Sequence, residues 1–127
     1  MEEHKKHRGF RDLKVYQLAY RLAMEIFEET KHFPVGEKHG LTSQLRRSSR
    51  SVPANIAEAW KKRIYSKAFV NKLVDSSGEA GETEVWLDMA LDSGYLTKER
   101  HKDFLDGYEE IGKMLYGMIT QPEKFCT

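Results

Sequence analysis

Cysteine and long apolar runs are nearly missing from this chain, and each absence excludes a class of protein. The single cysteine, Cys126, is the second-last residue, so no disulfide can form within the chain. No apolar run approaches the roughly 20 residues that a membrane-spanning helix needs. The N-terminal residues also lack the apolar core of a signal peptide. We therefore expect a cytoplasmic protein without a membrane segment.

Proline is scarce as well, with three residues in 127, while charged residues make up 32% of the chain. Both values favour helices over sheet. A chain of this length forms one domain and buries roughly two thirds of its unfolded surface. We expect a disordered tail at residues 1–9, a helical domain over 10–122 and a C-terminal tail at 123–127.

The net charge of +1 gives no general attraction to nucleic acid, but the charges are unevenly distributed. Residues 44–72 include eight basic residues and one acidic residue, a net charge of +7. Residues 73–110 include three basic and eleven acidic residues, a net charge of −8. Two interpretations remain open: adjacent antiparallel helices carry complementary charge, or one basic and one acidic surface meet in an assembly.

Apolar residues recur with a helical period in four segments. The first covers 10–30 and the second begins at about residue 38. The third begins after a good N-cap residue, Ser66, and runs to about residue 93, where Gly94 ends it; Thr97 caps the fourth. Short connections between helices are typical of antiparallel neighbours. The sequence therefore predicts an all-α fold, an antiparallel up-down-up-down four-helix bundle.

Pro53 lies inside the second helical segment. Proline removes one helical hydrogen bond and crowds the carbonyl four residues earlier. The apolar pattern nevertheless continues on both sides of it. We predict one kinked helix, with Ser51 as the N-cap of a new helix as the alternative.

One carboxylate falls on the predicted core stripe of the third segment. Glu84 is costly to bury unless it is paired. We expect a structural ion pair with Arg46 or Arg47, or hydrogen bonds to Asn55 and the serines of the second segment, which makes Glu84 and Asn55 buried polar residues. A catalytic acid is the alternative, but no second titratable group is placed to converge with it.

No other pattern indicates catalysis or metal binding. The five histidines lack the spacing that places two metal ligands on one helical face. The chain has no glycine-rich phosphate loop, and no Gly-x-Ser-x-Gly elbow surrounds a serine. We expect no metal, no other cofactor and no enzymatic activity.

Some apolar residues fall outside the predicted core stripes and favour a protein–protein surface. They favour a homo-oligomer over a monomer whose apolar residues are distributed unevenly around its core. The candidate interface residues are Trp60, Trp86, Met89, Tyr20 and Met24.

The basic residues of the second segment and of the link that follows form a candidate surface for phosphates. They are Arg46, Arg47, Arg50, Lys61, Lys62 and Arg63. The alternative is a basic face that is solvated or paired between subunits. We expect a non-enzymatic oligomer that binds RNA or DNA through these residues. The competing hypothesis is a protein-interaction scaffold with no nucleic-acid role.

Several motifs, in order along the chain, resemble one bacterial family. They are FRDLKVYQ (10–17), QLRRS (44–48), SVPANIAE (51–58) and GYL (94–96). The chain is similar in these to the four-helix-bundle family of 23S ribosomal-RNA intervening-sequence proteins. It departs from many members at Ala59-Trp60, where they have glycine.

The resemblance implies a ring-shaped homopentamer of four-helix bundles. The chain is also similar to the accessory proteins of diversity-generating retroelements, which share this architecture and contact nucleic acid and a reverse transcriptase. The resemblance implies nucleic-acid binding as a function to test, and it implies no catalytic residue.

Overall fold

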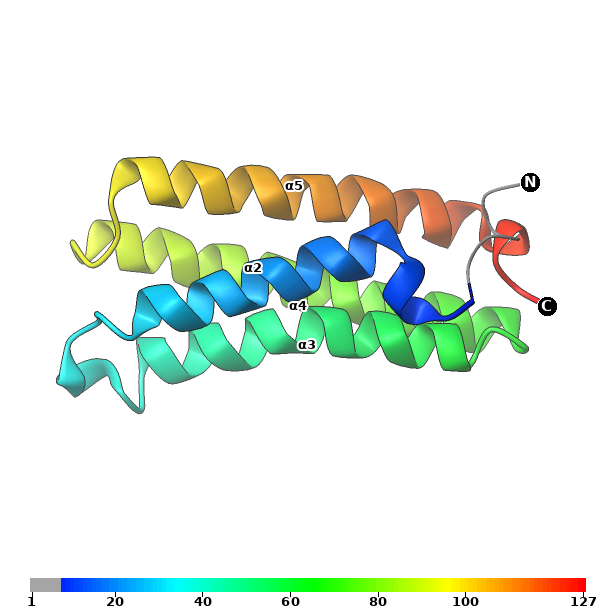
Figure 1. The fold of residues 1–127 in the computed structure, drawn as a ribbon, viewed down its shortest axis with the longest axis horizontal. Coiled ribbons are helices and arrows are strands. Elements are labelled where there is room, and N and C mark those ends of the chain that lie inside the picture. Colours follow the sequence, from blue (N-terminus) through cyan, green and yellow to red (C-terminus); the bar gives the residue numbers. More distant parts are fainter. Residues whose placement is uncertain (1–7) are drawn as a thin grey trace.

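A computed structural model describes residues 8–127, so the disordered tail predicted at residues 1–9 lies largely outside the described residues. Four long helices make up the molecule (Figure 1). They are α2 (Lys14–Thr30), α3 (Leu41–Lys61), α4 (Ser66–Asp92) and α5 (Lys98–Thr120). Three short 3-10 turns accompany them: η1 (Phe10–Asp12), η2 (Val35–Glu37) and η3 (Pro122–Lys124).

Consecutive helices run in opposite directions along the long axis of the molecule (Figure 1). The neighbouring pairs are α2 with α3, α3 with α4, and α4 with α5, while α2 and α5 are in looser contact. Residues 8–127 contain no strand. The predicted all-α four-helix bundle is confirmed.

The closest pair of helices is α3 and α4, and small side chains separate them. Ser48 and Thr83 are fully buried, with their hydroxyl oxygens 2.8 Å apart. The hydroxyl of Ser76, which is also fully buried, donates to the carbonyl of Val52 at 2.9 Å. These bonds satisfy polar groups that would be costly to bury unpaired, and the small side chains let the two helices approach closely.

Pro53 lies within the continuous helix α3, as predicted. It is buried, so packing on neighbouring helices holds it in place despite the lost hydrogen bond. Thr97 caps α5 as predicted, since its hydroxyl accepts a bond from the Arg100 N–H at 3.1 Å. Gly94 follows α4 with φ of +80°, a conformation that favours glycine. Ser66, predicted as an N-cap, is instead the first residue of α4.

Two buried stripes run along α3, and the sequence pattern predicted only one of them. One stripe follows the helical period of apolar residues in the second predicted segment and includes Leu45, Val52 and Ile56, all 1% exposed or less. The second stripe contains Thr42, Ser49, Pro53 and Trp60, which are also buried. A helix with neighbours on two sides buries two stripes, and α3 packs against both α2 and α4.

Candidate nucleic-acid interface

The six basic residues predicted to form one surface have four different environments in the structure. Arg46 holds the C-terminal turn of α2. Its Nε donates to the Thr30 hydroxyl at 2.8 Å, its Nη2 lies 3.4 Å from the Phe27 carbonyl, and its guanidinium stacks 4.6 Å from the centre of the Phe27 ring. This half-buried side chain is used within the fold and is not available to a phosphate.

Arg47 lies on the side of α3 that faces α4, where two carboxylates neutralise it. It pairs with Glu79 at 3.2 Å and forms a short ion pair with Glu82. The hydrogen bond from Arg47, helped by one from the Trp86 indole, lowers the pKa of Glu82. For this arginine, the interpretation that adjacent helices carry complementary charge is correct.

Lys62 and Arg63 are partly engaged. Lys62 lies 3.4 Å from Glu58, which also pairs with Lys72 at 3.2 Å. Hydrogen bonds from the two lysines lower the pKa of the Glu58 carboxyl, and the bond from Lys72 has the larger effect. Arg63 donates to the Trp60 carbonyl at 3.1 Å and stacks 4.0 Å from the centre of its ring.

Arg50 and Lys61 are exposed, and neither forms an ion pair with any residue of the described chain. Within residues 8–127, Arg50 contacts the Phe27 ring, whose centre lies 5.6 Å from its guanidinium carbon. Lys61 lies in the last turn of α3. Within the predicted set, these two are the exposed cations that no carboxylate of the described residues neutralises.

The bundle brings further basic residues to the end where α3 finishes. The turn η1 packs against α3 there, and α2 and α4 both begin at this end (Figure 1). Arg11, Lys14 and Lys67 are exposed, and no carboxylate of the described residues pairs with them. We call the whole group the basic end: Arg11, Lys14, Lys61, Lys62, Arg63 and Lys67.

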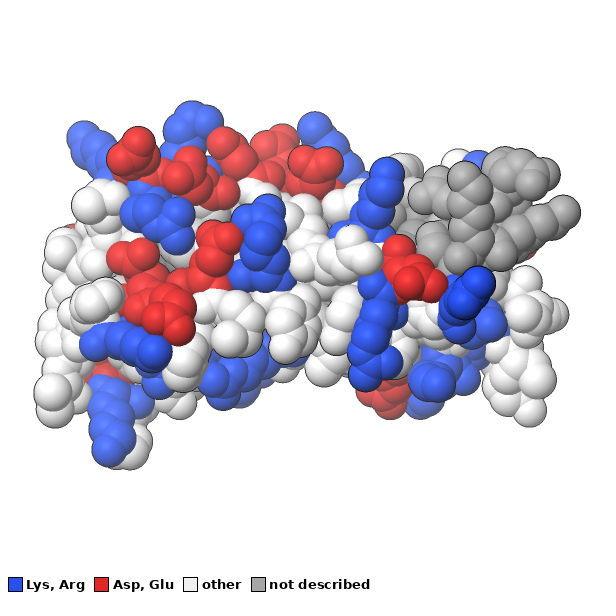
Figure 2. Space-filling view, viewed as in Figure 1, with Lys and Arg blue, Asp and Glu red and all other residues white. Residues whose placement is uncertain are grey.

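Figure 2 shows Lys and Arg side chains gathered over this end, with few carboxylates among them, whereas acidic and basic residues mix at the opposite end. Arg11, Lys14 and Lys67 are not among the predicted candidate residues, although Lys67 belongs to the basic segment 44–72. The signal that identifies the first two is the antiparallel pairing of the first two helices, which places the start of one beside the end of the other.

The partners predicted for Glu84 are wrong, because Arg46 and Arg47 are engaged elsewhere. Glu84 is half-buried, and the pKa of its carboxyl is raised by burial and then by the charges of Asp88 and Glu109. Asn55 is also half-buried, and its amide donates to the Ser51 carbonyl at 3.0 Å. Neither residue is fully buried as predicted.

One more buried polar group lies in the core. The hydroxyl of Tyr108 has no hydrogen-bond partner within residues 8–127, and burial, followed by the charges of Glu84 and Glu25, raises its pKa. The residue is 1% exposed, so this phenol is shielded from solvent.

The five residues predicted to form an interface between copies differ in their exposure: one is buried, one is half-buried and three are exposed. Trp60 is 4% exposed, so its prediction as a surface residue is wrong; it belongs to the second buried stripe of α3. Trp86 is half-buried, and its indole donates to Glu82 at 3.0 Å. Tyr20, Met24 and Met89 are exposed on the surface.

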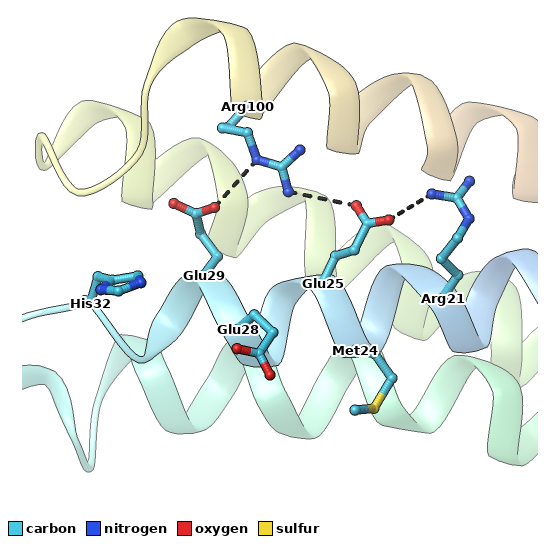
Figure 3. A pocket seen from close by; sticks show the side chains of 7 residues that line it. All are labelled: Arg21, Met24, Glu25, Glu28, Glu29, His32 and Arg100. Carbon is cyan, nitrogen blue, oxygen red and sulfur yellow. Dashed lines mark hydrogen bonds and ion pairs between the residues drawn. The ribbon is translucent and has the colours of Figure 1, made fainter.

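A groove of about 420 Å³ lies along the outer side of α2 and reaches Arg100 of α5 (Figure 3). Arg100 bridges the two helices, with Glu29 at 3.3 Å and Glu25 at 3.5 Å, and Glu25 also pairs with Arg21 at 2.7 Å. Met24 points away from Arg100 (Figure 3). Arg21, Glu25, Glu29 and Arg100 thus form one chain of ion pairs that connects α2 to α5.

Residues 8–127 contain no group of three or more potential metal ligands placed to share an ion. Within the same residues, no helix has both the length and the apolar character needed to cross a membrane.

The structure is thus a four-helix bundle with a basic end, and comparison with known proteins places it in a family. Residues 11–117 match the family model of the 23S rRNA-intervening sequence protein, and the chain belongs to this family. No curated protein matches the chain. The similarity to accessory proteins of diversity-generating retroelements stays a prediction.

A solved structure supports the same conclusion about the fold. It is the crystal structure of a protein of unknown function from the S23 ribosomal protein family of Bacteroides thetaiotaomicron. The two chains are 29% identical and superpose with a TM-score of 0.73, over 83% of this chain and 97% of the other.

Proposed function

We propose that this protein is a cytoplasmic homo-oligomer, without catalytic activity, that binds RNA or DNA through the basic end. The observation that carries the proposal is the set of exposed cations at the basic end that have no carboxylate partner in the described chain: Arg11, Lys14, Lys61 and Lys67. Cations that the fold does not neutralise are free to replace the counterions of a phosphate backbone.

One copy offers only a few such charges, and self-association would multiply them. Copies arranged in parallel around a ring would place every basic end on the same rim, where the charges face one nucleic acid together. The family resemblance makes five copies the expected number. The family is named for an intervening sequence of 23S rRNA, so RNA is the first ligand to test.

The test is fluorescence anisotropy with a labelled RNA and, separately, a labelled DNA duplex at low salt. Lys61→Glu combined with Lys67→Glu reverses two charges at the basic end. Lys38→Glu combined with Lys98→Glu makes the same change in charge on exposed residues at the opposite end of the bundle. Circular dichroism checks that both variants keep their helices.

We expect the first variant to weaken binding at least about tenfold, since each phosphate contact contributes to a salt-dependent affinity, and the second to change it far less. The proposal fails if the wild-type protein binds neither ligand at low salt, or if both variants weaken binding equally. A nuclease-insensitive protein partner recovered by pull-down would then favour the scaffold hypothesis.

A further inference from the structure

We infer that the outer face of α4 binds a second copy of this chain, and that it binds the face of α2 that carries Tyr20 and Met24. The inference rests on the self-association in the proposed function and names the two surfaces that meet. We call the first surface the α4 ridge: Val74, Gly78, Gly81, Val85 and Met89.

The α4 ridge is an exposed apolar surface on the outside of the bundle. Its residues recur every three or four positions, so they lie along one side of the helix. Val74 is 50% exposed, Val85 47% and Met89 49%. The solvent side of a bundle helix is normally polar or charged, and the ridge contains no polar side chain over its length. A contiguous apolar strip of this kind is typical of an interaction surface.

The two glycines of the ridge have no packing partner inside the bundle. A Cβ atom added at Gly78 or Gly81 would meet nothing within 4 Å. Gly107 of α5 is different, since its added Cβ would lie 2.7 Å from Leu22. Glycine destabilises a helix interior relative to alanine, and at Gly107 close packing within the bundle explains it. On the ridge, Gly78 and Gly81 have no side chain and so leave a shallow depression between Val74 and Val85. A large side chain of another copy can pack into this depression.

Charge excludes a contact between two α4 ridges. Residues 73–92 contain six carboxylates and no basic residue. Two α4 helices side by side would bring like charges together, which is unfavourable. The occupant of the ridge therefore needs apolar residues flanked by cations.

The α2 face meets both requirements. Tyr20 is 53% exposed and Met24 47% exposed. They lie on the same side of α2 as Phe27, whose ring contacts the guanidinium groups of Arg46 and Arg50 from α3. Arg50 has no carboxylate partner within the described chain, so it is available to the acidic rim of α4 in another copy.

The two surfaces also lie at the same height along the bundle. Arg46 binds Thr30 and Phe27, and two residues further along α3 Ser48 meets Thr83 of α4. The Phe27–Thr30 turn is therefore level with Thr83. Because α2 and α4 run in the same direction, the preceding turns, with Met24 and Tyr20, are level with Gly81, Gly78 and Val74.

A rotation about an axis parallel to the bundle would bring the two surfaces together without a shift along that axis. Such a contact joins different surfaces of identical copies, and it forms a ring when the rotation closes. Every basic end then lies on one rim, as the proposed function requires.

Site-directed cross-linking tests the contact. Cys126→Ser removes the single native thiol, and Met24→Cys and Gly78→Cys are then made as separate proteins. Light scattering of the unaltered protein is measured first. The two cysteine proteins are then exposed to a short bismaleimide, each alone and as a mixture that has been unfolded and refolded together so that both occur in one assembly. We expect cross-linked dimers in the mixture and few in either protein alone.

Three results would overturn the inference. The first is an assembled protein whose mixture gives no cross-link. The second is efficient cross-linking of the Gly78→Cys protein with itself, which means that two α4 ridges meet. The third is a monomeric unaltered protein, which would overturn the proposed self-association as well; nucleic-acid binding by the monomer, measured by anisotropy, would be unaffected by that result.

A matched pair of variants gives a second test that does not depend on cross-linking. Gly81→Gln fills the low part of the ridge, while Gly112→Gln makes the same change on α5, where an added Cβ also meets nothing within 4 Å. We expect Gly81→Gln to lower the mass of the assembly with unchanged helix content, and Gly112→Gln to leave it unaltered. Equal behaviour of the two variants contradicts the inference.

Discussion

The arginines in the first half of α3 and the lysines at its C-terminal end differ in what surrounds them. Arg46 and Arg47 reach across to α2 and α4, where a carbonyl, a hydroxyl and two carboxylates satisfy them. Lys61, at the end of the same helix, is exposed and pairs with no carboxylate of the described chain. A segment with a uniform basic composition therefore has one part that stabilises the fold and one part that remains available for a ligand.

The neighbouring helices explain this difference. The first half of α3 lies beside the acidic part of α4, which supplies Glu79 and Glu82. The end of α3 lies beside the starts of α2 and α4, where Lys14 and Lys67 add positive charge. Net charge along a sequence thus says little about a surface until the pairing of helices is known.

The largest expected effect that sharpens this comparison comes from shortening a core side chain in the first half of α3. Leu45 is 1% exposed, and Leu45→Ala removes buried methyl groups and leaves a cavity, so it should lower the free energy of unfolding by about 2–5 kcal/mol. Lys61→Ala at the end of the helix should change it by less than about 0.5 kcal/mol. Urea denaturation measures both, and an equal loss in the two variants would break the comparison.

A smaller loss of stability is expected when the half-buried Arg46 is replaced. Arg46→Ala removes donors from the Thr30 hydroxyl and the Phe27 carbonyl, and should lower the free energy of unfolding by about 1–3 kcal/mol. Arg50→Ala serves as the control, because the Phe27 ring is the contact that this exposed arginine makes within residues 8–127, and it should cost less than about 1 kcal/mol. Thermal and urea melts compare them; a harmless Arg46→Ala would contradict the role given to this side chain.

The stability of the bundle should depend on pH through Glu82 of α4. Its pKa is lowered below the ordinary 4.5, chiefly by the bond from Arg47, so it stabilises the fold above pH 4.5 and loses that contribution as the pH falls through its folded-state value. Glu82→Gln should therefore lower the urea midpoint at pH 7. The difference from the wild type should shrink below pH 4.5, and a constant difference at all pH values would count against the ion pair.

The smallest expected effect has the opposite sign. Burial raises the pKa of Glu84 above 4.5, so its ionised form destabilises the fold at neutral pH and that cost disappears as the pH falls below 4.5. Glu84→Gln should stabilise the protein slightly at pH 7 and have little effect in acid. A loss of stability at pH 7 would show that the carboxylate has a favourable partner.

The four helices and the continuity of α3 through Pro53 could be predicted because apolar periodicity and caps are local signals. The partners of individual arginines could not be predicted, since Arg46 and Arg47 contact different helices although they are adjacent in sequence. Trp60 was misplaced because a narrow apolar stripe hides the second buried stripe of a helix with two neighbours. Lys14 was missed because its closeness to the end of α3 arises only from antiparallel packing.

The most direct test of the central claim is the salt dependence of RNA affinity for the wild type and for Lys61→Gln combined with Lys67→Gln. If these lysines contact phosphates, the slope of log Kd against log salt should fall by roughly 1 for each lysine removed, with the fold unchanged. An unchanged slope, or an affinity that does not depend on salt, would contradict the claim that the basic end binds nucleic acid.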